Sequence, residues 1–293
     1  MKVVARGVFL WFFLGLVSCQ GPAVETIQIG PVLPPPPPQE EKLPLVITQL
    51  LDGVPDTVLA FRYAQNDQFV QARWRDRHVF FFEFDQQQQF RSYTLRVDGY
   101  DVKKIDKISQ QDDQIFFRQE IIDQEIFLRY RKSRMKVLSA DLNIIERLDE
   151  NNHAESMTFR DIEADTIVGM VKFDRMPNGN LLKLEEISRA PEVTQPLFTI
   201  NFEHDDRQTY FGRFGQLPEV VLLDIFEETR LSAFSMGNNA TKLAVETQRR
   251  TRRSQEVNHY EYIYDEQGYP LALDFITDRF GVLDTVRYFI TYR

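Results

Sequence analysis

Short runs of aromatic and β-branched residues, separated by polar turns, recur from Thr57 onward. Residues 58–63, 79–84 and 126–130 are examples, and each run has the length of a strand rather than of a helix. In residues 260–264 tyrosine alternates strictly with other residues, which places Tyr260, Tyr262 and Tyr264 on one face of a strand. The pattern predicts a mostly β protein: an extended antiparallel meander sheet or a half-barrel of hairpins, with one or two short helices.

Polar segments such as residues 65–67, 177–180 and 265–268 separate these runs. Asn178-Gly179 is the strongest hairpin signal, because both residues tolerate the positive φ of a type I′ turn. A looser repeated unit ends in aspartate at positions 85, 149, 174, 205 and 265. At these positions the aspartate side chain is expected to cap the turn that leaves the strand.

Two segments are candidates for the helices. Residues 43–51 could form a short helical turn. Residues 218–230 are the better case, because Pro218 suits a first turn and Val221, Leu222, Ile225 and Phe226 lie along one face. A buried strand remains the alternative for both segments.

The N-terminus has the three parts of a secretion signal. Lys2 and Arg6 precede an apolar stretch over residues 7–18, whose 12 residues are fewer than the roughly 20 of a membrane-spanning helix. The stretch ends in Leu-Val-Ser followed by Cys19, the one cysteine of the chain, and this resembles the lipobox of bacterial lipoproteins. We expect residues 1–18 to be removed and Cys19 to carry lipid; the alternative is a leader cut elsewhere, which leaves a soluble protein.

A proline-rich segment comes after Cys19, with Pro31 and five consecutive prolines at 34–38. Such a run favours a stiff polyproline II rod. We therefore interpret residues 19–44 as a lipidated tether, the alternative being a ligand for a proline-binding domain. Residues 45–293 are then a β-rich domain, which could consist of two sub-sheets divided near residues 190–198.

Charge narrows the choice of partner. The formal net charge of −9 becomes −11 without the leader, which contains two basic residues and no acidic one. An acidic protein is a poor partner for nucleic acid and for a flat anionic lipid surface. The membrane contact that we expect is the lipid anchor at Cys19.

Catalytic motifs are missing from the sequence. It contains no Gly-x-Ser-x-Gly elbow, no phosphate-binding loop and no dinucleotide fingerprint. The histidines at 78, 153, 204 and 259 are scattered, and His204-Asp205-Asp206 is more typical of a solvated loop than of a metal site. We predict no enzyme activity, no cofactor and no metal, although paired acids such as Asp112-Asp113 leave a carboxylate-dependent hydrolase as a third-ranked hypothesis.

Two further patterns suggest surface chemistry. Arg249, Arg250, Arg252 and Arg253 stand out in an acidic chain; they are either a charged hairpin loop or a contact for an anionic partner. Asp-Thr-apolar triplets at Thr57, Thr166 and Thr285 resemble the acceptor sites of Bacteroidota O-glycosylation.

The C-terminal third carries a resemblance to a family. Residues 237–242, and Tyr260 to Pro270 with its Tyr-x-Tyr-Asp-x-x-Gly-Tyr-Pro sequence, are similar to Bacteroidota lipoproteins of unknown function that contain YD-type β-repeats. The likeness is good over about residues 198–277 and degenerate over 57–184. It implies an antiparallel sheet on a lipid anchor in a diderm cell, and it implies no reaction.

These observations lead to three hypotheses of function. The first is a non-enzymatic binding or structural lipoprotein, whose partner would be a polysaccharide, a lipid or an envelope protein. The second is a carrier or chaperone for lipid or another amphiphile, with the Phe-rich run 79–84 lining a curved sheet. The third is the hydrolase. Gln20 and the lack of acids in residues 20–24 favour the outer membrane, facing the periplasm.

Overall fold

The computed structural model describes residues 42–75, 77–130, 140–188, 196–209, 217–229, 238–249, 252–279 and 282–293. The chain divides into Met1–Glu40 and a compact unit, Glu41–Arg293. The predicted signal, Cys19 and the tether as far as residue 41 lie outside the described residues. All of the described strands and helices belong to the compact unit.

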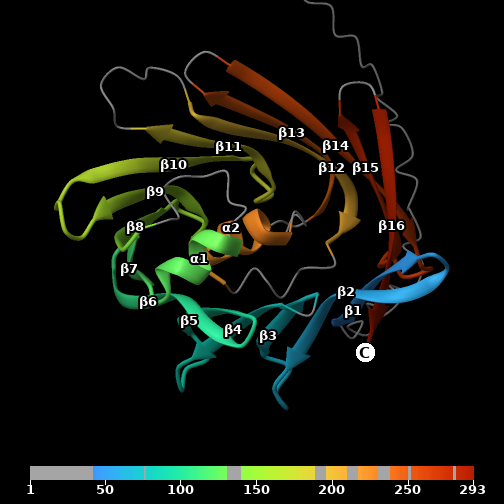
Figure 1. Cartoon of the computed structure of the whole chain (residues 1–293), viewed down its shortest axis with the longest axis horizontal. Helices are drawn as coiled ribbons and strands as arrows, with labels where there is room; N and C mark the ends of the chain where they lie inside the picture. Colours follow the sequence, from blue (N-terminus) through green and yellow to red (C-terminus); the bar gives the residue numbers. More distant parts are fainter. Residues whose placement is uncertain are drawn as a thin grey trace, which may run out of the picture. The chain divides into compact units, whose positions relative to one another are not determined.

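The described residues of this unit form sixteen antiparallel strands and two helices, and the sheet closes into a barrel (Figure 1). Each strand pairs with its neighbours along the chain, and β1 pairs with β16 to close the ring. The strands are β1 Pro44–Leu51, β2 Val54–Tyr63, β3 Phe69–Trp74, β4 His78–Phe84, β5 Phe90–Val97, β6 Tyr100–Gln111, β7 Gln114–Ile121, β8 Leu142–Leu148, β9 Ala154–Asp161, β10 Ile167–Arg175, β11 Leu181–Ser188, β12 Phe198–Gln208, β13 Asn238–Arg249, β14 Arg252–Tyr264, β15 Pro270–Arg279 and β16 Val282–Tyr292. The helices are α1 Gln124–Tyr130 and α2 Glu219–Thr229.

The predicted antiparallel β architecture is thus confirmed, and the sheet is closed rather than open or half-closed. Closure joins Pro44 to Tyr292 and Ile47 to Ile290. The sheet also continues through the suggested division near residues 190–198, because β11 pairs with β12 across it. The described residues therefore form one sheet.

The two faces of the barrel wall differ in polarity. In β8, for example, Leu142, Ile144, Glu146 and Leu148 are buried and alternate with more exposed residues. Buried positions throughout the wall are mainly aliphatic or aromatic and belong to one core cluster. The buried side chains of the wall are thus mainly apolar, while other apolar side chains, such as Leu45, Val168 and Ile263, are exposed on it.

Five hairpins at one rim share the same loop. In each, the first residue donates its N–H to the carbonyl of the fifth, and the fourth donates to the carbonyl of the first. This is a three-residue loop, a type I turn followed by one left-handed residue. The fourth residues, all with positive φ, are Asp67, Gln88, Asn152, Gly179 and Gly268.

The prediction at Asn178-Gly179 is therefore right about the hairpin and wrong about the turn type. Only Gly179 has a positive φ, of 85°. Two-residue turns with positive φ at both positions occur at Asp52-Gly53 and Asp98-Gly99, where the flanking residues pair directly.

Aspartate caps three of the five loops as expected. The Oδ1 atoms of Asp85, Asp149 and Asp265 each accept two backbone N–H groups of their own loop. Asp205 accepts the N–H groups of Arg207 and Asn239. The prediction fails at Asp174, which lies inside β10 opposite Lys183.

The helix predictions are mixed. Residues 44–51 are strand β1, and α2 begins directly after Pro218, whose carbonyl accepts the N–H of Val221 at 3.0 Å. The run 126–130, predicted as a strand, lies in α1. There the Asp123 carboxylate caps the N–H of Ile126 at 2.8 Å, and Glu125 pairs with Arg129 one turn later, so local capping outweighs the strand preference of the aromatic residues.

Candidate functional site

Helix α2 lies within the ring of strands (Figure 1). Val220, Val221, Leu222 and Leu223 are fully buried, and Ile225 is nearly so. The sequence suggested one apolar face, but a helix enclosed by a barrel needs apolar residues on all sides. Two acidic residues of this helix, Glu219 and Asp224, are buried with them.

Asp224 is held by two side chains of the barrel wall. Its Oδ1 accepts a hydrogen bond from Lys103 Nζ of β6 at 2.5 Å, and its Oδ2 accepts one from Tyr93 Oη of β5 at 2.6 Å. The Lys103 side chain is 0% exposed and that of Asp224 7%. Both carboxylate oxygens therefore have a partner, as a buried charge requires.

Glu219 belongs to a second buried cluster. Its carboxylate pairs with Arg175 of β10, and both side chains are 5% exposed. Glu146 of β8 accepts the N–H of Val220 at 3.3 Å, which satisfies one free donor in the first turn of α2. Burial, then the charge of Glu219, raises the pKa of Glu146 to about 8, so this carboxyl is mostly neutral at pH 7.

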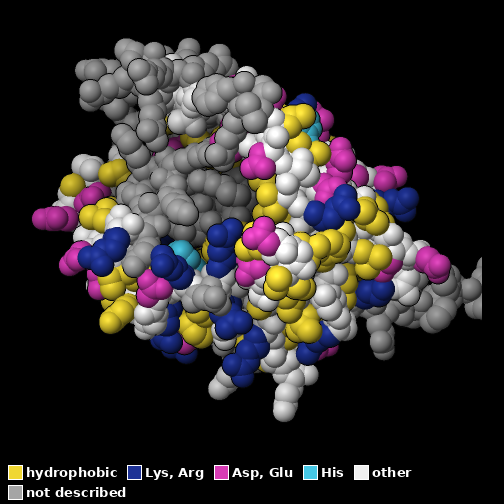
Figure 2. All heavy atoms as spheres, turned by 45° about the vertical axis from the view of Figure 1, so that its right-hand side comes forward, with side chains coloured by type: hydrophobic (Ala, Val, Ile, Leu, Met, Phe, Trp, Pro, Cys, Tyr) yellow, Lys and Arg dark blue, Asp and Glu magenta, His cyan; other side chains and the backbone are white. Residues whose placement is uncertain are grey.

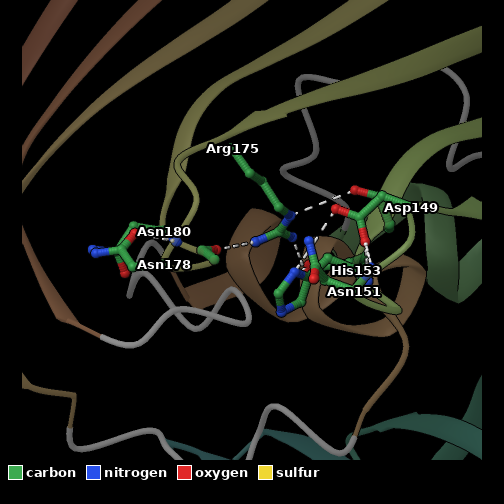
Figure 3. A network of polar contacts seen from close by, with 9 residues as sticks. Asp149, Asn151, His153, Arg175, Asn178 and Asn180 are labelled. Atoms are coloured by element: carbon green, nitrogen blue, oxygen red, sulfur yellow. Dashed lines mark hydrogen bonds and ion pairs between the residues drawn. The ribbon is translucent and has the colours of Figure 1, made fainter.

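Arg175 also ties this cluster to the rim of the barrel (Figure 3). It donates to the carbonyl of Gly179 at 2.8 Å and reaches that of Ala154 at 3.5 Å, so it contacts the loops β8–β9 and β10–β11 together. Asn180 then exchanges hydrogen bonds with Asn238 at the start of β13. Two loops and one helix terminus are thus joined through one guanidinium group.

The three tyrosines of β14 lie on one face of the strand, as predicted, and the structure shows that this is the inner face. The rings of Tyr262 and Tyr264 lie 5.8 Å apart, and Tyr260 is 3% exposed against Phe275. Tyr264 donates to Asp205; burial, then this hydrogen bond, raises the pKa of the Tyr264 hydroxyl. Asn239 donates to the same hydroxyl at 3.3 Å.

These contacts bear on the hydrolase and carrier hypotheses. Glu146 and Glu219 do bring two carboxyl groups together, but both are buried. Glu219, in the first turn of α2, pairs with Arg175, and Glu146 of β8 accepts an N–H group of the same turn, so both hold the helix. In the Phe-rich run, Phe80 stacks on Tyr93 at 6.2 Å and Phe82 lies 4.7 Å from Phe69, both in the core. The buried carboxyl groups thus stabilise the position of α2, and the rings of Phe80 and Phe82 pack against other side chains of the protein.

The outer face of the barrel is charged. Ion pairs join side chains on it, including Arg287–Asp274, Lys242–Glu203 and Lys183–Glu185. Figure 2 shows such charged side chains spread among hydrophobic ones. Over β2–β5 this face is hollowed into a groove of about 630 Å³, whose lining includes Arg62, Gln71, Phe81 and Arg96.

Among the described residues, no helix has both the length and the apolar character to cross a membrane. Nor does any group of three or more His, Cys, Asp and Glu side chains in the described ranges lie close enough to hold a metal ion. His204 packs on Phe202, and burial lowers the pKa of its imidazole.

The other predicted surface residues fall at hairpins and exposed strands. Arg249 ends β13 and pairs with Arg252 at the start of β14, so the run does form a hairpin tip; Arg250 and the side chains of the other three arginines lie outside the described residues. The proposed acceptors Thr57, Thr166 and Thr285 are all exposed, next to the β1–β2, β9–β10 and β15–β16 turns. Those turns share the rim opposite the five-loop rim.

Sequence reasoning did not identify the buried ionic residues. The one available signal was Asp224, a single charge inside the apolar run Val-Val-Leu-Leu-Asp-Ile-Phe. Its partners Lys103 and Tyr93 are 121 and 131 residues away along the chain, so no local pattern links them.

Comparison with known proteins adds little. No family model and no curated protein matches the chain. Among solved structures it is similar to a porin-like protein from Bacteroides uniformis: the two are 9% identical, the match covers 86% of this chain and 97% of that chain, and the TM-score is 0.49. The function is therefore argued from this chain's own residues.

Proposed function

We propose that the protein is a lipid-anchored envelope protein whose barrel stands in water beside the outer membrane and acts as a non-enzymatic binding or structural module. The observation that carries this proposal is the distribution of charge on the wall. Its buried positions are mainly apolar, and its outer face carries ion pairs within the strands, among exposed apolar side chains such as Leu182, Ile263 and Leu271. The lipobox at Cys19 and the proline-rich segment after it supply the anchor and the spacer.

The polarity argument is physical. A barrel that spans a membrane presents an apolar band about 25 Å tall to lipid, and a Lys or Arg at its midplane costs about 2–4 kcal/mol. Here Lys242 of β13 and Arg287 of β16 lie within strands on the outer face, each with an acidic partner. These two charged side chains are stable in water and would be costly in lipid.

The interior supports a module that does not transport. A spanning channel keeps its lumen polar, whereas here the described part of α2 lies inside the ring and buries Val220 to Leu223. The ion pairs of Asp224 and Glu219 fix this helix to the wall. We therefore expect a partner or ligand to bind at the outer face or the rims of the barrel.

Membrane attachment tests the proposal. Residues 1–19 would be replaced by a leader that is cleaved before Gln20 and adds no lipid, and the protein would be followed through cell fractionation beside the natural chain. We expect the natural chain in the membrane fraction and the lipid-free chain in the soluble fraction, folded without detergent. A lipid-free chain that stays in the membrane, and leaves it only with detergent, would show that the barrel itself inserts.

A further inference from the structure

We propose that the groove on the outer face of β2–β5 binds an acidic glycan, a saccharide chain that carries carboxylates, through Arg62 and Arg96. This inference rests on the proposed function, because it names the ligand of a barrel whose outer face is in water. It rests on the geometry of the groove and on the hydrogen-bonding groups that the two arginines leave uncommitted.

Arg96 is held in place before any ligand arrives. Its Nε donates to Asp101 at 2.7 Å, and its guanidinium carbon lies 4.9 Å from the centre of the Phe81 ring. Its terminal nitrogens make no hydrogen bond within the described part of the chain. A fixed guanidinium with free terminal donors suits a carboxylate, because little side-chain freedom is lost on binding.

Arg62 supplies a second donor across the groove. It is exposed on β2, and no ion pair or hydrogen bond joins it to another described residue. Gln71 lies opposite it on β3, and Phe81 and Thr94 continue the same cross-strand row. The groove thus presents amide, hydroxyl and aromatic groups between two guanidinium groups.

The lining of the groove holds two arginines, Arg62 and Arg96, and two acids, Glu83 and Asp101, so its formal charges balance and a nearby arginine supplies the positive excess. Asp101 is paired with Arg96, and Glu83 accepts a hydrogen bond from Ser92 at 2.8 Å. Arg73, one row away on β3, is exposed and also has no ion pair among the described residues. A second groove, on β8–β11, differs, because there Arg147 faces Glu155 and Lys183 pairs with Glu185.

The net charge of the chain and the polar lining of the groove together decide between anionic ligands. With a formal charge of −11 after removal of the leader, the protein repels polymers of high charge density such as nucleic acid, and it repels an anionic bilayer. An acidic glycan is also repelled by the net charge, but its many hydroxyl groups match the amide and hydroxyl side chains of the groove, whereas a phosphate backbone or a bilayer surface presents mainly charge. The expected ligand is therefore a uronic-acid type of chain.

The experiment uses the full mature chain, purified with its native N-terminus in non-ionic detergent, so it does not depend on how the barrel meets the membrane. Calorimetric titration with an oligogalacturonate of defined length should show binding that weakens as salt is added. A maltooligosaccharide of the same length should bind far more weakly. Equal binding of the two sugars, or tighter binding of phosphatidylglycerol vesicles or a single-stranded oligonucleotide, would overturn the proposal.

Variants locate the site. Arg62→Gln should weaken oligogalacturonate binding about tenfold, since it removes one charge-assisted contact. Among the described residues, the side chain of Arg62 makes no hydrogen bond or ion pair, so the variant should unfold like the natural protein. Arg96→Gln should weaken binding at least as much. The matched control is Arg118→Gln, at an exposed arginine on β7 outside the groove that likewise has no ion pair with another described residue, and it should leave binding unchanged. An equal loss of oligogalacturonate affinity in all three variants would mean that binding is non-specific charge attraction, and it would contradict the assignment of the site to this groove.

Discussion

The inner and outer faces of the barrel wall both carry ion pairs, but the two sets of pairs differ in what they contribute to the fold. Inside, Lys103 and Asp224 are 0% and 7% exposed and join β6 to a helix 121 residues away. Outside, Arg287 and Asp274 are 53% and 16% exposed and join neighbouring strands that already pair through their backbones. Both distances are 2.5 Å, so geometry alone does not distinguish them.

The difference is one of solvent. A charge inside has lost its hydration and depends on its partner, whereas a charge outside keeps water as an alternative partner. The inner pairs therefore determine where α2 lies, and the outer residues make the wall compatible with water. Four measurements separate the two roles.

The largest effect is expected when one inner partner is removed. Lys103→Met leaves the Asp224 carboxylate buried without its cation and should lower the free energy of unfolding by about 3–5 kcal/mol, measured in urea. The double variant Lys103→Met, Asp224→Leu removes both charges and should recover most of that loss. A double variant as unstable as the single one would mean that the charges themselves, rather than their pairing, are needed.

The next effect is on the pH dependence of stability. The pKa of Glu146 is about 8 in the folded protein and 4.5 in the unfolded chain, so between these values the folded state binds more protons. Stability should therefore fall as pH rises from about 4.5 to about 8. Glu146→Gln should flatten this part of the curve in urea titrations across pH. A natural protein and a variant with the same slope would show that Glu146 is not buried as described.

Two loops of the same rim give a smaller, paired comparison. Gly179 and Gly268 have φ of 85° and 88°, so alanine at either costs about 1–2 kcal/mol for the left-handed backbone. A Cβ at Gly179 would also lie 3.0 Å from the His153 ring, whereas at Gly268 it would meet nothing within 4 Å. Thermal unfolding should rank Gly179→Ala as the less stable of the two. The reverse order would mean that the Arg175 network tolerates movement of its loop.

The smallest effect is expected on the outer face. Arg287→Gln removes a pair that lies largely in water, so the urea midpoint should shift less than in Gly268→Ala. The shift should shrink further in high salt, because salt screens exposed pairs. A loss as large as that of Lys103→Met would show that the outer pairs also determine the fold.

The sequence was a good guide wherever the controlling interaction is local. Strict alternation placed the tyrosines of β14 on one face, and aspartate predicted the caps of the loops at 85, 149 and 265. It misled at residues 126–130, where aromatic residues favoured a strand and the Asp123 cap produced helix α1. It also gave the wrong turn type at Gly179, since an Asn-Gly pair suits two loop geometries that differ by one residue.

By itself the sequence determined that the chain forms antiparallel hairpins and which residues turn between them, because period-two alternation and turn chemistry act over a few residues. The tertiary structure decided that the sheet closes and that α2 lies inside it. Closure joins residue 44 to residue 292, and Asp224 finds its partners more than a hundred residues away. Burial makes those partners necessary, and only the folded chain brings them within reach.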